Sequence, residues 1–211
     1  MEPKKISKKL LTRLPIYLNY IKSLPENTTN ISATKIANAL DLGDVLVRKD
    51  LAKISNGGRR KTGYQRENLI KDIEDFLDVN TMTSTIVVGA GKLGQALLDY
   101  GGFEASGLTV LAGFDIQPAS KRAEGGKPIY PMTKLESFCR NNEIRIAIIA
   151  VPAGHAQEVC DTLVSCGVRA IWNFAPVHLN VPEDIVVQSE NLAVSLTALR
   201  MQLKTREKNV Q

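Results

Sequence analysis

The stretch Thr85-Ile-Val-Val-Gly-Ala-Gly-Lys-Leu-Gly94 decides the fold of the second part of the chain. Its β-branched run predicts a strand, and residues 95–100 continue as a helix. A Gly-x-Gly-x-x-Gly segment is typical of dinucleotide-binding βαβ units only when it lies between a strand and a helix, and here it does. We therefore predict a Rossmann-type unit with a phosphate-binding turn at these glycines.

Each glycine of this turn has its own expected role. Gly89 permits the tight turn, Gly91 lets the backbone approach a pyrophosphate, and Gly94 allows the helix to pack closely on the strand. The free N–H groups and partial positive charge at the helix N-terminus then favour the phosphates. The residues expected at this site are Gly89, Ala90, Gly91, Lys92, Leu93 and Gly94.

A second strand, residues 109–114, leads to Asp115, 21 residues beyond Gly94. A carboxylate there accepts hydrogen bonds from the adenosine ribose hydroxyls and repels a 2′-phosphate. The implied cofactor is NADH or NAD⁺ rather than NADP(H), although the neighbouring cations Lys121 and Arg122 oppose that preference. The alternative interpretation of Asp115 is an ordinary turn residue.

Strands and helices alternate up to residue 189. Expected helices cover residues 133–141 and 153–166, and expected strands cover 144–151, 168–172 and 185–188. This order predicts an α/β fold with a doubly wound parallel sheet. Ligands bind at the C-terminal ends of strands in such sheets, which adds Ala150, Val151, Pro152, Asn173 and Phe174 to the expected cofactor site.

The net charge of +5 lies entirely in the first 80 residues. That segment holds 15 Lys and Arg against 10 Asp and Glu, whereas residues 81–211 hold 12 against 12. Stopping at Lys71 gives 15 against 6, a net charge of +9. A basic segment joined to a neutral one predicts two domains and an anionic partner for the first.

The basic segment has a helix-turn-helix pattern. Apolar spacing predicts a first helix around residues 10–21, and Ser32 and Asp44 are the expected N-caps of a second and a third. The third helix, residues 45–55, turns Arg48 and Lys49 outward. Two short helices joined by a glycine-containing turn, with cations on the second, favour insertion into the DNA major groove.

The segment Asn56-Gly-Gly-Arg-Arg-Lys-Thr-Gly-Tyr64 predicts a winged hairpin with three cations at its tip. Such a loop reaches the DNA backbone or the minor groove, and Arg or Lys on the helix matches the guanine acceptors O6 and N7. A charge run alone is usually a solvated face, so the prediction depends on helices, wing and charge together. The expected DNA contacts are Ser32, Arg48, Lys49, Arg59, Arg60, Lys61 and Tyr64.

Composition excludes other classes of protein. With 44% hydrophobic and 23% charged residues, the chain is globular, and its longest apolar runs fall short of the ~20 residues of a membrane helix. The first nine residues lack the apolar region of a secretory signal. The three cysteines form no Cys-x-x-Cys pair, which predicts reduced thiols in the cytoplasm, and with two histidines we expect no metal site.

These separated motifs resemble those of the Rex family of bacterial redox-sensing transcriptional repressors. The resemblance runs from about Thr12 to Leu203 and includes Val47-Arg-Lys-Asp-Leu51 and Asn173-Phe-Ala-Pro176. It implies a homodimer with winged-helix domains (residues 1–80), Rossmann domains (81–189) and a C-terminal helix (190–211) exchanged between subunits. It further implies binding to inverted-repeat operator DNA that NADH reverses.

The resemblance also implies residues that couple the two sites. The family uses an Arg on the first helix, a Tyr after the glycine-rich helix and an Asp on the exchanged helix. Arg13 and Tyr100 match the first two, but Ala193 occupies the position of the Asp. Leu46 and Ser55 also replace the usual Gln and Gly, which bears on the operator preference.

Three alternatives stay open. The first is a small NAD-dependent oxidoreductase, for which Tyr130 and Lys134 supply a Tyr-x-x-x-Lys spacing, although Pro131 places Tyr130 before the helix. The second is a winged-helix regulator that senses CoA or FAD. The third is a DNA-binding protein in which NADH coupling is weak or absent.

Overall fold

The structure is a computed structural model that describes residues 6–208. The chain divides into two compact units, residues 1–81 and 82–211. Each unit has its own hydrophobic core, as expected for domains that fold separately.

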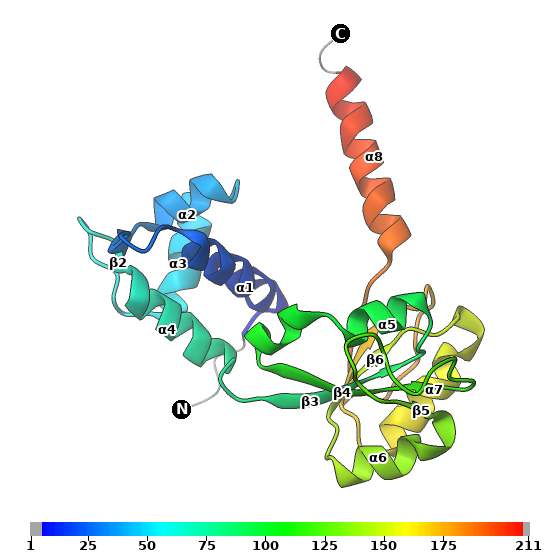
Figure 1. Ribbon diagram of the computed structural model, residues 1–211. Helices are drawn as coiled ribbons and strands as arrows, with labels where there is room; N and C mark the ends of the chain where they lie inside the picture. The colour runs from blue at the N-terminus through cyan, green and yellow to red at the C-terminus, as the bar shows by residue number, and fades with distance from the viewer. Residues whose placement is uncertain (1–5, 209–211) are drawn as a thin grey trace. The chain divides into compact units, whose positions relative to one another are not determined.

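The first unit is built from four helices and a two-stranded antiparallel sheet (Figure 1). Its elements are α1 (Lys8–Ser23), β1 (Asn30–Ile31), α2 (Ala33–Ala39), α3 (Asp44–Ile54), β2 (Tyr64–Gln65) and α4 (Arg66–Leu77). One apolar side of each helix packs into a common core that contains Leu14, Tyr17, Ile36, Leu51 and Ile73. Because isolated helices this short are marginal in water, this shared core stabilises them.

The expectation that Ser32 caps the second helix is confirmed. The Oγ atoms of Ser7 and Ser32 accept hydrogen bonds from the backbone of Leu10 and Lys35, at 3.3 and 3.1 Å, so both serines are N-caps. The expectation for Asp44 is wrong. Gly43 is the N-cap of α3, and Asp44 is its first helical residue.

The predicted hairpin is present between α3 and β2. Arg59 and Gly63 pair through two backbone hydrogen bonds of 2.8 and 2.9 Å, and Arg60, Lys61 and Thr62 form the tip between them. Gly63 has φ +73°, and a Cβ there would collide with the carbonyl of Ile31. This position therefore requires glycine, which supports the antiparallel return of the wing.

The second unit contains a six-stranded sheet in which all neighbours are parallel (Figure 1). The spatial order is β5-β4-β3-β6-β7-β8, the doubly wound order of Rossmann folds. The strands are β3 (Thr83–Val88), β4 (Leu108–Asp115), β5 (Ile129–Pro131), β6 (Ile146–Ile149), β7 (Ala170–Asn173) and β8 (Val186–Ser189). The direction of winding reverses between β3 and β6, which is where such sheets bind ligands.

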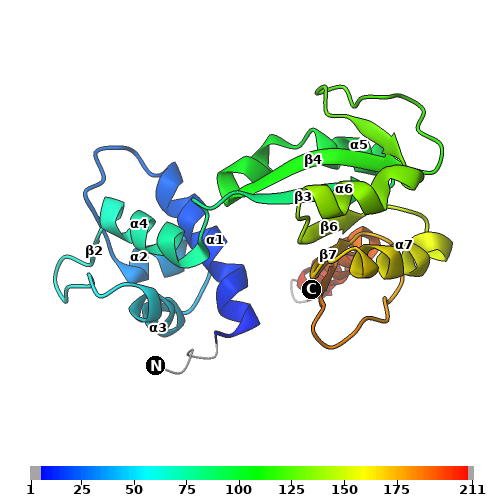
Figure 2. The ribbon, with the colours of Figure 1, turned by 90° about the horizontal axis from the view of Figure 1, so that it is seen from below.

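Helices cover both faces of this sheet. α6 (Leu135–Asn141) and α7 (Ala153–Ser165) share one core with Ile86 and Val88, and α5 (Lys92–Leu98) shares the other with Val87. Figure 2, seen from below, shows α6 and α7 lying across the strands. The alternation of Ile86, Val87 and Val88 between two cores follows from the two-residue repeat of a strand.

Short elements complete the unit. The 3₁₀ turns η1 (Gly101–Ser106) and η2 (Met132–Lys134) precede β4 and α6, and α8 (Leu192–Lys208) follows β8. The expected helix over residues 133–141 thus begins as a 3₁₀ turn, and β5 is an additional strand. Among residues 6–208, no helix combines the length and apolar character needed to cross a membrane.

Candidate functional site

The exposed side of α3 and the wing form the candidate nucleic-acid surface of the first unit. A groove of about 340 Å³ runs between them. It brings together six of the seven residues expected to contact DNA, Ser32, Arg48, Arg59, Arg60, Lys61 and Tyr64. Lys49 is exposed on α3 outside the groove lining. A concave surface lined by this many cations favours an anionic partner.

Arg48 is oriented by a carboxylate one helical turn before it. Its Nη2 donates to Oδ2 of Asp44 at 2.6 Å, and the Thr34 hydroxyl donates to the other oxygen of Asp44 at 2.8 Å. Asp44 therefore connects α2 to α3 and restrains the guanidinium. The pair is exposed, so it adds little stability but sets the direction in which Arg48 points.

Two of the expected DNA contacts also support the surface. The Ser32 hydroxyl oxygen caps α2. Tyr64 is buried, its ring packs beneath Gly58 at the base of the wing, and burial raises the pKa of its phenol. A Cβ on Gly58 would lie 2.8 Å from this ring, so the close packing requires glycine.

A buried ion pair fixes α3 from behind. Asp50 accepts hydrogen bonds from Nε and Nη2 of Arg13 on α1, at 2.7 and 3.0 Å, and from the Tyr17 hydroxyl at 3.0 Å. The hydrogen bonds to Asp50 raise the pKa of Arg13, and burial raises the pKa of Tyr17 to about 12. These hydrogen bonds join α1 to α3.

The second unit has a cavity of about 670 Å³ at the C-terminal ends of β3, β4 and β6. Six residues expected to contact the cofactor line it: Gly89, Gly91, Asp115, Ala150, Val151 and Pro152. Backbone hydrogen bonds join the strand ends. The N–H of Gly89 donates to the carbonyl of Phe114 at 2.7 Å, and the N–H of Ala150 donates to the carbonyl of Val88 at 2.8 Å. The cavity lies at the reversal point of the sheet, as a dinucleotide site does.

The three glycines of the turn differ in their surroundings. Gly89 has φ +97°, a conformation that favours glycine. A Cβ at Gly94 would overlap the carbonyl oxygen of Gly89. At Gly91, in contrast, a Cβ would meet nothing within 4 Å. The fold therefore requires glycine at positions 89 and 94, whereas Gly91 leaves open space beside the backbone.

The carboxylate of Asp115 connects the glycine-rich turn to the end of β4. Its Oδ2 accepts from the backbone N–H of Ala90 at 2.8 Å, and its Oδ1 accepts from that of Gln117 at 2.9 Å. These bonds orient both oxygens at the mouth of the cavity while leaving lone pairs for further donors. A pair of ribose hydroxyls fits this acceptor.

Six of the expected cofactor contacts do not line the cavity: Ala90, Lys92, Leu93, Gly94, Asn173 and Phe174. Ala90 is buried beneath the turn, where its N–H holds Asp115. Asn173 is fully buried, and its amide bonds the backbone of Ala175 and Val177. Its side chain thus closes the loop after β7, and the Phe174 ring packs on Trp172 at a centroid distance of 4.5 Å.

Sequence reasoning missed part of the cavity lining. The additional residues are Val88, Ile116, Met132, His155, Glu158, Val159 and Thr162. Four of them recur along α7 at intervals of three and four residues, which places them on one side of the helix. That spacing was visible in the sequence, but its relevance depends on knowing that α7 follows the strand at the reversal point.

The expected coupling residues occupy separate places. Arg13 belongs to the buried pair with Asp50. The Tyr100 side chain is exposed beside Phe103, with ring centroids 4.9 Å apart, and Ala193 is exposed on the first turn of α8.

Tyr130, Lys134 and the three cysteines are the side chains considered for catalysis or metal binding. Lys134 Nζ lies over the ring of Tyr130 at 5.4 Å from its centroid, a cation–π contact. Cys139, Cys160 and Cys166 are buried free thiols, and burial raises the pKa of Cys139 to about 12. Residues 6–208 contain no cluster of metal-binding side chains.

Two family models match the chain. The model described as "CoA binding domain" matches residues 80–177, and the model described as "Putative DNA-binding protein N-terminus" matches residues 5–52. Both matches agree with the separation of a nucleotide cavity from a DNA-binding surface.

Curated relatives and solved structures match nearly the whole chain. The redox-sensing transcriptional repressors Rex of Porphyromonas gingivalis and Carboxydothermus hydrogenoformans are 34% and 37% identical over 203 residues, 95% of this chain and 93% and 97% of theirs. RSP, a Rex-family repressor, has been solved with NAD⁺ and operator DNA (TM-score 0.87, 31% identity, 97% and 95% coverage). Its complex with NADH gives a TM-score of 0.85, with 31% identity and coverage of 99% and 100%. The predicted α/β fold is thereby confirmed.

Proposed function

The chain belongs to the Rex family of redox-sensing transcriptional repressors, and on that premise we propose how its two units perform the repression. The first unit binds inverted-repeat operator DNA, and the second binds NADH or NAD⁺. Occupancy by NADH lowers the affinity for the operator, so the repressed genes are released when NADH accumulates. The main support for this proposal is that one short chain combines a cation-lined helix and wing with a cavity that fits a dinucleotide.

The DNA-binding unit uses its charges in two ways. α3 enters the major groove, where Arg48 and Lys49 reach base edges, and the wing residues Arg59, Arg60 and Lys61 follow the backbone into the minor groove. Backbone contacts supply most of the affinity and make it salt-dependent, whereas the helix supplies sequence preference.

The residues of the cavity fit a dinucleotide. Open space beside Gly91 accommodates the pyrophosphate, and Asp115 accepts hydrogen bonds from the adenosine ribose. The bound nicotinamide supplies the redox-dependent difference between NADH and NAD⁺. The free ribose diol that Asp115 favours also distinguishes NAD(H) from CoA, whose adenosine ribose carries a 3′-phosphate.

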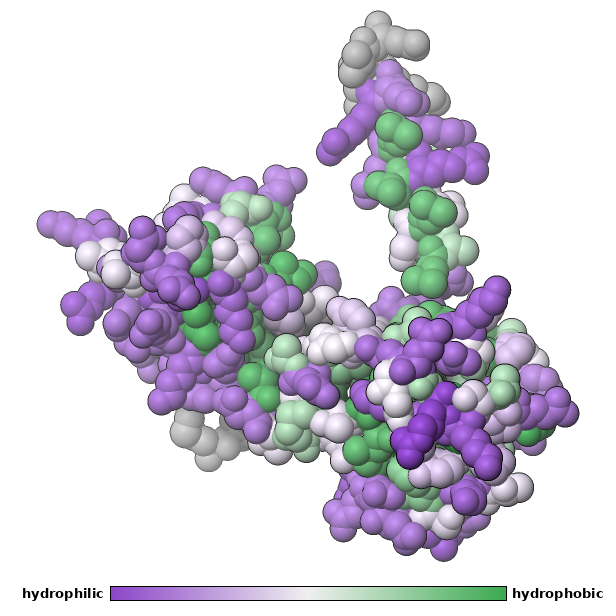
Figure 3. Space-filling view, in the orientation of Figure 1, coloured by the Kyte–Doolittle hydropathy of each residue, from purple (hydrophilic) through white to green (hydrophobic). Residues whose placement is uncertain are grey.

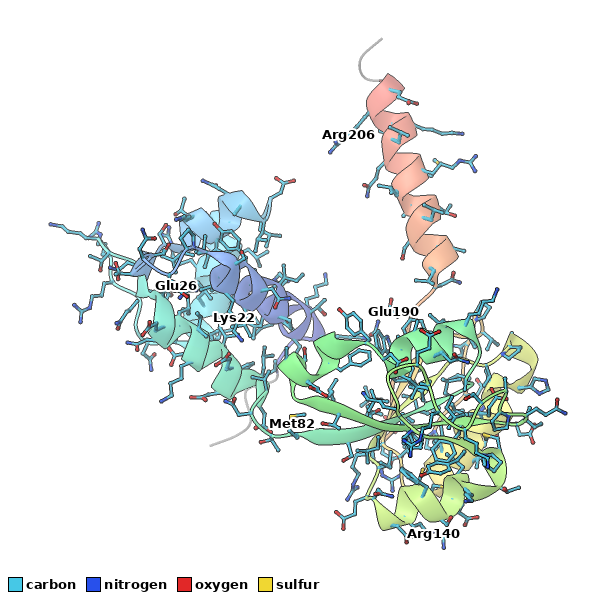
Figure 4. All side chains as sticks on the ribbon, viewed as in Figure 1. Lys22, Glu26, Met82, Arg140, Glu190 and Arg206 are labelled. Carbon is cyan, nitrogen blue, oxygen red and sulfur yellow. The ribbon has the colours of Figure 1, made fainter. Side chains whose placement is uncertain are left out.

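The active form is a homodimer joined through α8. Its apolar residues Leu192, Val194, Leu196, Leu199, Met201 and Leu203 are between 56% and 68% exposed within one chain. Figure 3 shows hydrophobic side chains along the helix, and Figure 4 marks Glu190 before its start and Arg206 near its end. Exposed apolar residues repeated over several turns favour burial against a second copy, and a two-fold dimer matches an inverted-repeat operator.

Rex proteins are regulators rather than enzymes, and we propose that this chain likewise binds NADH without oxidising it. We also propose that it acts in the cytoplasm. A test of binding uses Trp172, the single tryptophan, as a fluorescence donor to the reduced nicotinamide. We expect saturable energy transfer with NADH, competition by NAD⁺, and no loss of nicotinamide absorbance with carbonyl substrates. Steady oxidation of NADH would support the oxidoreductase alternative instead.

A further inference from the structure

α3 carries two exposed apolar side chains among its cations. Val45 is 63% and Leu46 39% exposed, whereas Val47 and Leu51 of the same helix are fully buried. At about 100° per residue, Val45 lies about 40° from Lys49 and opposite the buried side of the helix. Val45 therefore occupies the centre of the solvent-facing surface, with Arg48 and Lys49 beside it.

Neither packing nor helix formation accounts for Val45. It belongs to no core cluster of the unit, and a β-branched residue has a weaker helix propensity than the charged residues around it. The patch of Val45 and Leu46 is too small for a protein interface. The exposed cations Arg48, Lys49 and Lys53 lie on the same helix, and Arg48 is paired with Asp44. An anionic partner with an apolar group at its surface fits these features better.

DNA is such a partner. The first residues of the second helix in a helix-turn-helix contact base edges, and Val45 is the second residue of α3. In the major groove the apolar group among the base edges is the C5-methyl of thymine. The charged groups of Arg and Lys bind phosphates and guanine edges, whereas an apolar side chain contacts a methyl group without a charge to desolvate.

We propose that Val45, flanked by Leu46, determines operator specificity by packing on the C5-methyl group of a thymine, adjacent to a base read by Lys49. This inference rests on the proposed DNA-binding function. It assigns sequence selectivity to an apolar contact at a position where the helix otherwise presents cations.

The test replaces thymine by uracil, which keeps the hydrogen-bonding edge and lacks the methyl group. The full-length chain first selects an inverted-repeat duplex from a random-sequence library. Each thymine pair, one per half-site, is then replaced in turn, and affinity is measured by fluorescence anisotropy. We expect uracil to weaken operator binding at one position only. The affinity should fall about three- to five-fold for each methyl group removed, which is the effect of exposing one methyl group to water.

The variant Val45→Ala is expected to bind the thymine duplex more weakly and to lose the thymine–uracil difference at that position. It should fold normally because the side chain is exposed. The control is Val186→Ala, a valine of similar exposure (65%) in the second unit, which should keep the full difference.

The outcomes separate the two proposals. If the wild-type chain binds every uracil duplex as tightly as the parent, or if Val45→Ala retains the difference, the methyl-reading role is wrong and DNA binding stands. If the chain enriches no duplex from the library, both proposals fail.

Discussion

The guanidinium of Arg13 holds the carboxylate of Asp50 through two hydrogen bonds, of 2.7 and 3.0 Å, and thereby joins α1 to the back of α3. The Asp50 side chain is only 3% exposed. The resemblance to the Rex family implies a coupling role for Arg13, together with an Asp at the position that Ala193 occupies here. Asp50 is the carboxylate that pairs with Arg13 in this structure, and the pair connects α1 to the helix that carries Arg48 and Lys49.

Replacing Asp50 by Asn should destabilise the first unit by about 3 kcal/mol, because the charge of Arg13 loses its partner in a largely buried place. The matched control is Asp44→Asn, on the same helix, whose exposed pair with Arg48 should cost under about 0.5 kcal/mol. Urea unfolding measures both. Equal costs for the two variants would show that burial does not set the strength of the Arg13 pair.

Gly91→Val should abolish NADH binding while leaving the melting temperature nearly unchanged. A side chain at position 91 points into open space that the pyrophosphate needs, and its backbone dihedral φ of −70° suits any residue. Gly94→Ala should instead lower the melting temperature, because its Cβ overlaps the carbonyl of Gly89. Calorimetry measures the melting temperature of both variants, and titration measures their NADH affinity. If Gly91→Val binds NADH normally, the glycine-rich turn does not contact the pyrophosphate.

Ala193→Asp should strengthen the response to NADH. A carboxylate at this position supplies the anion that competes with Asp50 for Arg13, as the family pattern implies. We expect the ratio of operator affinities without and with NADH to rise about five-fold or more, within the usual range of coupling. Ala193→Asn is the uncharged control. An unchanged ratio in the Asp variant would indicate that this chain couples its sites through other residues.

Stability should fall as pH rises from about 10 to 12. The pKa of Tyr17 is raised from 10.0 to about 12 by burial and by its bond to Asp50, so the folded state favours the protonated phenol. That contribution is fully present below pH 10 and is lost as pH approaches 12. Unfolding free energies of the Tyr17→Phe variant should decline less steeply over this range. Parallel curves for the two proteins would show that Tyr17 does not titrate with unfolding.

The sequence predicted features that depend on local pattern. The glycine-rich turn, the cap at Ser32 and the wing follow from residue types at fixed spacing, and the structure contains all three. β5 was missed because Ile129-Tyr-Pro131 has no strand pattern and becomes a strand only by pairing with β4. Glu158 and the other lining residues of α7 were missed for the same reason, since tertiary placement brings them to the cavity.

The most direct test of the account is a titration of NADH into the preformed complex of the full-length chain with a fluorescent operator duplex. We predict that anisotropy falls to the value of free DNA with NADH, and that NAD⁺ at equal concentration has a weaker or opposite effect. The Asp115→Ala variant should bind the operator normally and need more NADH for release. An anisotropy that stays constant through saturation of the NADH site, confirmed by energy transfer from Trp172, would contradict the proposed switch.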